Sequence, residues 1–176
     1  MNKIDLFFEE YKRKYNLKDN LKYKDVFSFG DDELLELVLE GKKRATSSLL
    51  KEYELESEDL PKIGDISIVT NNDGEPYCII EDTKVITLRF NEMTFEICKY
   101  EGEDNSLQSW REKHYKFFKE LCDDLKIEFK EDDYIVFEYF KVLYQKDHKI
   151  MKTLNMPKAD IEMLKNDIYE DDMYKD

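Results

Sequence analysis

The segment from Asp133 to Tyr144 is the most β-like run of the chain. β-Branched and aromatic side chains are dense in it, and such side chains fit the pleated, half-buried surface of a strand. Its strand-forming residues include Tyr134, Val136, Tyr139 and Val142. The run therefore predicts a long strand that crosses the core of the β portion.

A hairpin and a further strand are predicted upstream of this run. Ile66 and Ile68 alternate with their neighbours in a first strand, and the turn signal Asn71-Asn72-Asp73-Gly74 follows. Residues 77–82 are predicted as the return strand and residues 84–90 as a third strand. This order favours an antiparallel or mixed barrel.

Apolar residues at helical spacing predict helices on both sides of the β portion. The first covers Ile4 to Tyr15, and the second covers residues 31–40 with Asp31 as its N-cap. A short helical turn is expected after Leu49, and a short helix capped by Asn91 is expected to reach residue 100. Ser106 caps the longest helix. The predicted fold class is α+β, a small mixed β-barrel surrounded by helices.

The balance of charge restricts the classes of partner. Lys and Arg number 28 and Asp and Glu number 42, which gives a formal net charge of -14. Nonspecific binding to nucleic acid depends on basic side chains that neutralise phosphates. Contact with RNA would therefore be local, or the ligand would be a small nucleoside with little charge.

Cysteine usage and hydropathy indicate a compartment. Cys78, Cys98 and Cys122 are an odd number without close pairing, which is typical of reduced thiols. The first residues hold no long apolar run of the kind found in signal peptides. No window approaches the ~20 apolar residues that span a bilayer. We expect a cytoplasmic protein with no membrane partner.

The chain divides into three parts by composition. Residues 1–26 are predicted to supply a helix that packs on the barrel, and residues 27–144 form the main domain. Residues 145–176 are predicted to be an acidic helical extension. From Lys158 onward this extension holds seven acidic residues and three lysines, while apolar residues still recur at helical spacing.

The stretch from Gly41 to Ser48 concentrates chemistry in this acidic chain. It reads Gly-Lys-Lys-Arg-Ala-Thr-Ser-Ser, three consecutive cations followed by a run of hydroxyl residues. Gly41 stands where the preceding helix would end in the left-handed conformation that glycine adopts at low cost. We expect the cations and the hydroxyls to lie on a loop that the flanking elements hold in place.

Two motifs resemble the ASCH domain family, whose small β-barrel is related to the PUA domain. Gly41, Lys43 and Thr46 match the first three fixed positions of the signature G-x-K-x-x-T-x-R. Residues 100–107, followed by Trp110, Arg111 and His114, resemble the E-G-E-G-D-x-S-L-x-x-W-R-x-x-H run of one bacterial branch. The spacer at residues 60–65 is also similar to that branch, and the resemblance spans roughly Phe27 to Tyr144.

One position departs from the family signature. Ser48 stands where the signature has arginine, so the grip of that arginine on an anionic or carbonyl group is missing. Arg44 and Arg89 are candidates to replace it.

The resemblance implies a candidate hydrolase that removes the acetyl group from the exocyclic amine of cytidine. By matching positions, Lys43, Thr46 and Glu103 would form the catalytic set. Thr46 or a water would attack the acyl carbon, with Lys43 activating the attacker and Glu103 managing the proton of the leaving amine. The substrate-binding candidates are Lys42, Arg44, Ser48, Ser106, Tyr100 and Trp110. No cofactor is implied.

Each candidate also has a structural interpretation. The lysines could stabilise a helix C-terminus. In the catalytic interpretation, a partly dry pocket beside Lys42 and Arg44 would lower the pKa of Lys43, because neighbouring cations disfavour its protonated form. Glu101 and Asp104 compete with Glu103 as the acid. Trp110 and His114 share an apolar helix stripe that is typical of core residues. No Cys/His cluster has the spacing of zinc ligands, so we expect no metal.

Three further functions remain open at this point. The lysines and a hydroxyl are compatible with cleavage of single-stranded RNA, although the net charge disfavours long polyanions. A barrel of this kind is equally compatible with RNA or nucleotide binding without chemistry. The last alternative is an acidic domain that binds another protein, which predicts that Lys43 and Thr46 lie far from Glu103.

Overall fold

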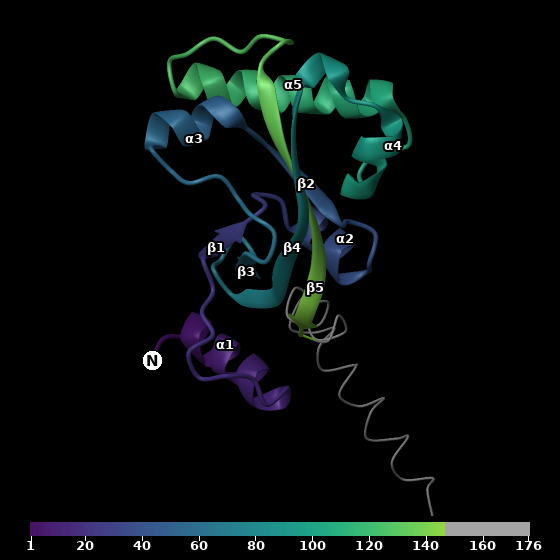
Figure 1. The fold of residues 1–176 in the computed structure, drawn as a ribbon. Coiled ribbons are helices and arrows are strands. Elements are labelled where there is room, and N and C mark those ends of the chain that lie inside the picture. Colours follow the sequence, from purple (N-terminus) through teal and green to yellow (C-terminus); the bar gives the residue numbers. More distant parts are fainter. Residues whose placement is uncertain (147–176) are drawn as a thin grey trace, which may run out of the picture. The chain divides into compact units, whose positions relative to one another are not determined.

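The computed structural model describes residues 1–146, and in them one curled five-stranded sheet carries the helices around it (Figure 1). The strand order is β1-β3-β4-β5-β2. The strands are β1 (Asp25–Ser28), β2 (Ala45–Leu49), β3 (Ile66–Thr70), β4 (Pro76–Arg89) and β5 (Tyr134–Gln145). β1 pairs with β3 in parallel, and the other neighbours are antiparallel.

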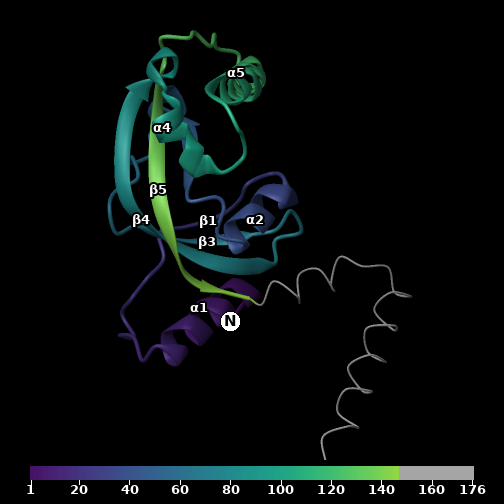
Figure 2. The same cartoon turned by 90° about the vertical axis from the view of Figure 1, so that its right-hand side faces the viewer.

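The long strands β4 and β5 form the spine of the sheet and curve along their length (Figure 2). β4 is a single strand where the sequence predicted two, so that prediction is wrong. The register shifts between Asp82 and Lys84, and the Thr83 hydroxyl donates to the carbonyl of Tyr139 at 3.2 Å. An extra residue of this kind bends a strand without ending it.

Strand β2 corrects the prediction for the hydroxyl run. The cations lie on a connection after α2, but Thr46, Ser47 and Ser48 belong to β2 and pair with β5. This polar run lacks the apolar alternation that identifies a strand from sequence, so only pairing with β5 reveals it.

The helices are α1 (Lys3–Lys14), α2 (Asp32–Leu39), α3 (Leu50–Glu56), α4 (Phe95–Cys98) and α5 (Leu107–Asp124). Asp31 caps α2 and Ser106 caps α5, as predicted. The helix expected from Asn91 is instead α4 between two 3₁₀ turns, Phe90–Glu92 and Lys99–Glu101, with Thr94 at the α4 N-cap. The short turns place Glu101 at a sharp change of direction before α5.

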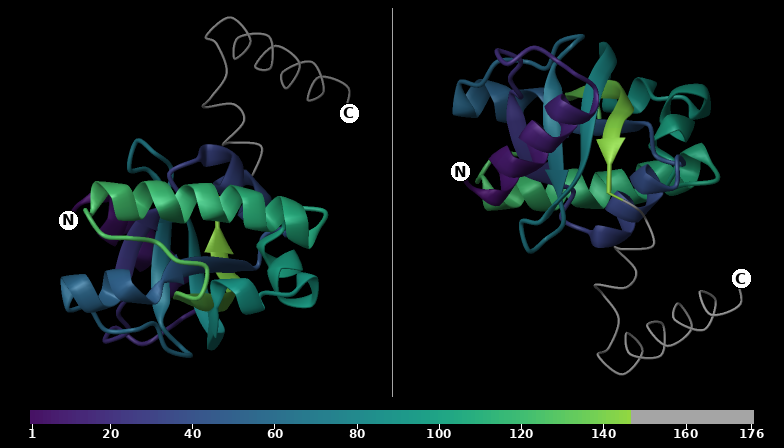
Figure 3. Two further views of the ribbon diagram at one scale, coloured as in Figure 1. Left: turned by 90° about the horizontal axis from the view of Figure 1, so that it is seen from above. Right: turned by 90° about the horizontal axis from the view of Figure 1, so that it is seen from below.

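Two clusters of apolar side chains hold the helices on the sheet, toward opposite ends of its long strands (Figures 1 and 3). Trp110, Phe118 and Cys122 of α5 pack with buried residues of β2 and β5 and with partly buried residues of β4. Phe7 and Phe8 of α1 pack with residues of β3 and β4. The predicted α+β class is therefore confirmed, with the sheet as a curled half-barrel whose edges are β1 and β2.

Several other expectations can be compared with the described residues. Cys78, Cys98 and Cys122 are buried free thiols. Within residues 1–146, each helix is too short or too polar to cross a bilayer. The predicted acidic helix lies, from residue 147 onward, outside the described residues.

Two carboxyl groups lie against each other on the neighbouring strands β4 and β5. Burial is the largest factor that raises the pKa of Glu138, and the charge of Asp82 and the hydrogen bond with it raise that pKa further. Burial also raises the pKa of Asp82, although the hydrogen bond with Glu138 acts in the opposite direction. The folded pair therefore retains a proton at pH values where the unfolded chain has released it.

This pair makes a prediction about stability and pH. Because the native state binds the extra proton, its contribution to the free energy of unfolding should fall as pH rises from about 5 to about 8. Glu138→Gln keeps a donor for Asp82 without the titrating proton, and should raise the free energy of unfolding at pH 8 by on the order of 1 kcal/mol. Urea unfolding at both pH values measures this effect. Glu58→Gln is the control, because Glu58 is exposed and lines the same hollow as the pair; the free energy of unfolding of this variant should change with pH as in the wild type. If the free energy of unfolding of Glu138→Gln also changed with pH as in the wild type, the shared proton would be contradicted.

Candidate functional site

The Lys43 side chain is the centre of the site, and only 1% of it is exposed. Its Nζ lies 2.8 Å from Oε2 of Glu103 and 3.6 Å from Oε1 of Glu101. The same amine lies 5.4 Å from the centre of the Phe29 ring. A buried ammonium is tolerated only where carboxylates and hydrogen bonds compensate for the lost water, and this site supplies both.

Glu101 is the most buried acid of the site, with 2% of its side chain exposed. Its carboxylate accepts a hydrogen bond from Nε1 of Trp110 and one from Oγ of Ser47 at 3.2 Å. Burial alone would raise the pKa of Glu101. The hydrogen bond from His114, the charges of Lys43 and His114, and the Trp110 N–H together lower it instead.

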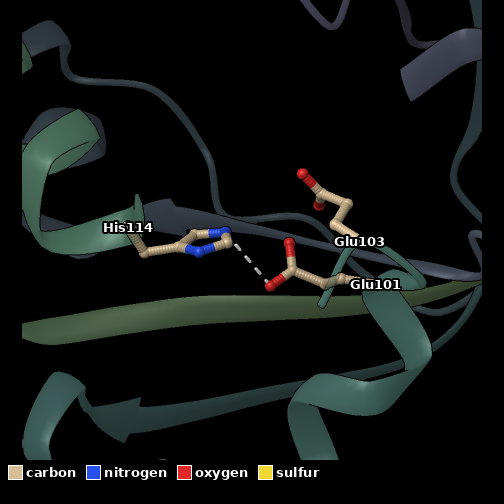
Figure 4. A group of neighbouring side chains, drawn as sticks. All are labelled: Glu101, Glu103 and His114. Carbon is tan, nitrogen blue, oxygen red and sulfur yellow. Dashed lines mark ion pairs between the residues drawn. The ribbon is translucent and has the colours of Figure 1, made fainter. Parts of the chain in front are cut away.

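His114 approaches Glu101 from α5, and the imidazole and the carboxylate point toward each other (Figure 4). Nε2 lies 3.3 Å from Oε2 of Glu101, and Nδ1 lies 2.9 Å from the carbonyl oxygen of Trp110. Burial acts to lower the pKa of His114. The hydrogen bond with Glu101, the charges of Glu101 and Glu103, and the Trp110 carbonyl outweigh it and raise the pKa.

Close backbone approach holds the two segments of the site together. The N–H of Arg44 donates to the carbonyl of Tyr100 at 2.8 Å. Gly102 has a φ of +72°, and a Cβ at this residue would lie 2.2 Å from the carbonyl oxygen of Lys42. Only a residue without a side chain permits this contact. Gly102 therefore sets the position of Glu101 and Glu103 relative to Lys43.

A cavity of about 360 Å³ opens beside these groups. Acidic, basic, hydroxyl and aromatic side chains line it together. They are Phe29, Gly30, Asp31, Leu34, Lys43, Thr46, Ser47, Glu101, Glu103, Lys113, His114 and Phe117. The volume lies within the range of about 300–1,000 Å³ that is usual for small-molecule sites.

The structure brings the three predicted catalytic residues to one cavity. Lys43 and Glu103 form an ion pair, and Thr46 lines the same wall. In the part of the chain that the structure describes, the Thr46 hydroxyl forms no hydrogen bond, while that of Ser47 is engaged by Glu101. The proposal that Lys43 lies beside other cations is wrong, because its amine faces two carboxylates.

The other polar candidates near Lys43 point elsewhere. Lys42 is exposed and pairs with Glu40 at 3.0 Å. Nη1 of Arg44 donates to the carbonyls of Val38 and Lys43, each at 2.9 Å. The Ser48 hydroxyl lies 2.9 Å from that of Tyr53. Arg89 packs over the ring of Tyr134, so neither proposed arginine lines the cavity.

The remaining candidates have structural contacts. Ser106 caps α5 by accepting from the N–H of Ser109. Tyr100 is partly exposed, and its ring packs edge-on against Tyr139. Trp110 is fully buried and stacks between Phe90 and His114, so its ring offers no face to a ligand.

Glu101 and His114 are more central to the site than the sequence predicts. The motif favours Glu103 over Glu101 as the acid, and the apolar helix stripe predicts that His114 is a core residue. The i, i+4 spacing of Trp110 and His114 is a signal that they share a helix face, and their rings stack at 4.3 Å. Nothing in the sequence around Phe29 indicated that it would cover Lys43.

Three side chains of metal-binding type lie close together. One ligand atom of each of Glu101, Glu103 and His114 falls within 4.8 Å of the others. The Lys43 ammonium already supplies positive charge to both carboxylates, and Nε2 of His114 is directed at Glu101. A divalent cation could be held here only if the ammonium moved away.

A family model described as the ASCH domain matches residues 25–144. The chain belongs to the ASCH domain family. A solved ASCH domain from Lactobacillus crispatus JV V101 is 36% identical, with a TM-score of 0.71 over 80% of this chain and 94% of that one. A protein from Enterococcus faecalis V583 is 31% identical, with a TM-score of 0.76 over 85% of this chain and 93% of that one. A comparison with curated protein sequences gave no match.

Gly102 provides a test of how this ASCH site is assembled. Gly102→Ala places a methyl group against the Lys42 carbonyl, so the acidic segment must move away from Lys43. Gly74→Ala is the matched control, since its φ of +78° is similar and open space surrounds its Cβ position. The control should lose roughly 1 kcal/mol in the free energy of unfolding, and Gly102→Ala a further 1–3 kcal/mol or so. Equal losses in urea unfolding would show that the backbone contact does not constrain the site.

Proposed function

We propose that this ASCH domain binds a small uncharged nucleoside and hydrolyses an amide on it, with acetylated cytidine as the model substrate. The observation that supports this most directly is the meeting of Lys43, Thr46 and Glu103 at one cavity. An ammonium, a hydroxyl and a carboxylate can serve in amide hydrolysis as the oxyanion stabiliser, the nucleophile and the general acid and base. Their convergence argues against the alternative in which these residues lie far apart.

The cavity offers a suitable environment for a nucleobase. Phe29, Leu34 and Phe117 contribute apolar surface. Most of the polar groups come from residues 43–47, from the segment before α5 and from α5 itself. An aromatic ring can stack on a base of any identity. The polar wall would then face the exocyclic amide.

The proposed chemistry assigns one task to each residue. The Thr46 hydroxyl or a water attacks the acyl carbon, and Glu103 accepts the proton of the attacker. The Lys43 ammonium stabilises the negative charge that develops on the acyl oxygen. Glu103 then returns the proton to the leaving amine as the C–N bond breaks. Attack by water gives the carboxylic acid directly, and attack by Thr46 gives an ester that a water cleaves next.

The charge around the cavity supports a nucleoside over RNA. A second hollow shares Asp31, Leu34, Glu103 and Lys113 with the cavity and therefore adjoins it. Its other lining residues are Glu33, Glu36, Leu37 and Glu40. A phosphate that approached across this acidic rim would be repelled, which adds a local reason to the overall charge of -14.

Substitutions of Lys43, Thr46 and Glu103 should lower the rate of hydrolysis, whereas substitutions of neighbouring residues outside the cavity should not. Glu103→Gln keeps the shape but cannot take the proton, and Lys43→Met removes the charge beside the acyl oxygen. Each should lower kcat for acetylated cytidine by about 100-fold or more. Thr46→Val should do the same if the hydroxyl is the nucleophile. Release of cytidine measured by chromatography gives the rates.

The exposed neighbour Lys42 provides the control. Lys42→Met should keep wild-type rates, because its amine pairs with Glu40 outside the cavity. Far-UV circular dichroism confirms that each variant is folded. Full activity in folded Glu103→Gln would exclude the proposed proton transfer, and a wild-type protein that leaves the substrate intact would exclude the proposed function.

The acidic rim predicts selection by substrate charge. The 5′-monophosphate of acetylated cytidine should have a kcat/KM about tenfold lower than the nucleoside at low ionic strength, because the rim repels it. Added salt should narrow this difference, since it screens the repulsion. Glu33→Gln should narrow it as well, while Glu112→Gln on the outside of α5 should not. A monophosphate that is the better substrate, and that loses this advantage in salt, would show that the site attracts phosphate.

A further inference from the structure

Two ionisable residues of the site have no part in the proposed chemistry. Glu101 and His114 are more buried than Glu103, and Glu101 reaches the catalytic set through its ion pair with Lys43. Together with Lys43 and Glu103 they form a chain of alternating charge, from His114 to Glu101 to Lys43 to Glu103. The chain is neutral only when His114 carries a proton on each nitrogen.

The contacts of His114 favour that doubly protonated form. Nδ1 faces the carbonyl oxygen of Trp110, which can only accept a hydrogen bond. Nε2 faces the Glu101 carboxylate, which also accepts. A neutral imidazole could donate to one of these groups and would turn a lone pair toward the other. The raised pKa of His114 agrees with this geometry.

The distances around Lys43 indicate how the pair formed by Glu101 and His114 affects the position of the Lys43 amine. Nζ lies 2.8 Å from Glu103, but 3.6 Å from Glu101. Glu101 already accepts from Trp110, Ser47 and His114, so its charge is largely compensated. Without the imidazolium, Glu101 would be a buried carboxylate with one cation in reach, and it would draw the ammonium away from Glu103.

We propose that Glu101 and His114 are positioning residues: their buried carboxylate–imidazolium pair keeps the Lys43 ammonium on Glu103, at the cavity. The catalytic meaning of this position rests on the proposed function, whereas the position itself does not. Other charged groups also surround this pair. The charge of Glu103 helps to raise the pKa of His114, and Asp31 lines the same cavity from the start of α2. Lys113 forms an ion pair with Asp104. As pH rises and His114 loses its proton, Lys43 should move toward Glu101.

Nuclear magnetic resonance of the wild-type chain tests the arrangement without any substrate. The chain has two histidines, His114 and His148, so the imidazole ¹⁵N spectrum is simple and His148→Gln assigns it. We expect both nitrogens of His114 to be protonated at neutral pH. The ¹³Cε signal of Lys43, assigned with Lys43→Arg, should shift with the same midpoint as His114. A neutral His114 at pH 7, or a Lys43 signal that ignores its titration, would overturn the proposal.

Matched variants add a second test that does not depend on the titration. His114→Gln keeps a side-chain donor for Glu101 but no charge, and should shift the Lys43 signal and abolish its pH-dependent change. Glu112→Gln, on the same helix and exposed, should leave both unchanged. An unchanged Lys43 signal in folded His114→Gln would contradict the positioning role.

Kinetics then connects the position to the reaction. In the wild type, kcat for acetylated cytidine should fall as His114 loses its proton and Lys43 leaves Glu103. His114→Gln should lower kcat by about tenfold, with KM little changed, and should remove this fall at high pH. If His114→Gln had the wild-type kcat and the same decrease of kcat at high pH, the pair of Glu101 and His114 would have no effect on catalysis. If wild-type protein does not cleave this substrate, the proposed function fails, and the Lys43 spectra still decide the positioning role.

Discussion

The ion pair between the buried Lys43 ammonium and Glu103 is the constraint on which the site depends. Water cannot compensate for a lysine amine with 1% of its side chain exposed, so two carboxylates must reach it from a segment about 60 residues away. That requirement links the end of α2 to the start of α5. Any displacement of either segment would leave a buried charge without its partner, which costs several kcal/mol.

The fold meets this constraint through backbone contacts rather than side-chain adjustment. Gly102 allows the acidic segment to pass against the Lys42 carbonyl, and the Arg44 N–H bonds to Tyr100 in the same region. On the far side, α5 is fixed by Trp110 and Phe118 in the apolar core. His114 therefore arrives at Glu101 from a rigid helix, and the packing of the core is continuous with the geometry of the site.

Local sequence signals predicted the elements that depend on local physics. Asp31 and Ser106 cap their helices, and Gly41 takes a positive φ after α2. The long strand predicted over residues 133–144 is β5, Tyr134–Gln145. Where pairing at long range decided the outcome, the local signals failed. β2 is a polar run that becomes a strand only because β5 lies beside it. β4 continues through a bulge between Asp82 and Lys84, where the sequence predicted the end of one strand and the start of another.

For the site, the sequence alone determined which residue types were present and that two motifs shared the chemistry of an ammonium, a hydroxyl and an acid. Only the tertiary structure decided that these groups meet at one cavity and that Glu101 is central to the site. It also decided that Arg44, Ser48 and Trp110 make their contacts elsewhere. The physical reason is that burial and charge pairing depend on contacts between distant segments. The sequence specifies the hydrogen-bond donors and acceptors, but the fold determines which of them are buried away from water and therefore need a partner in the protein.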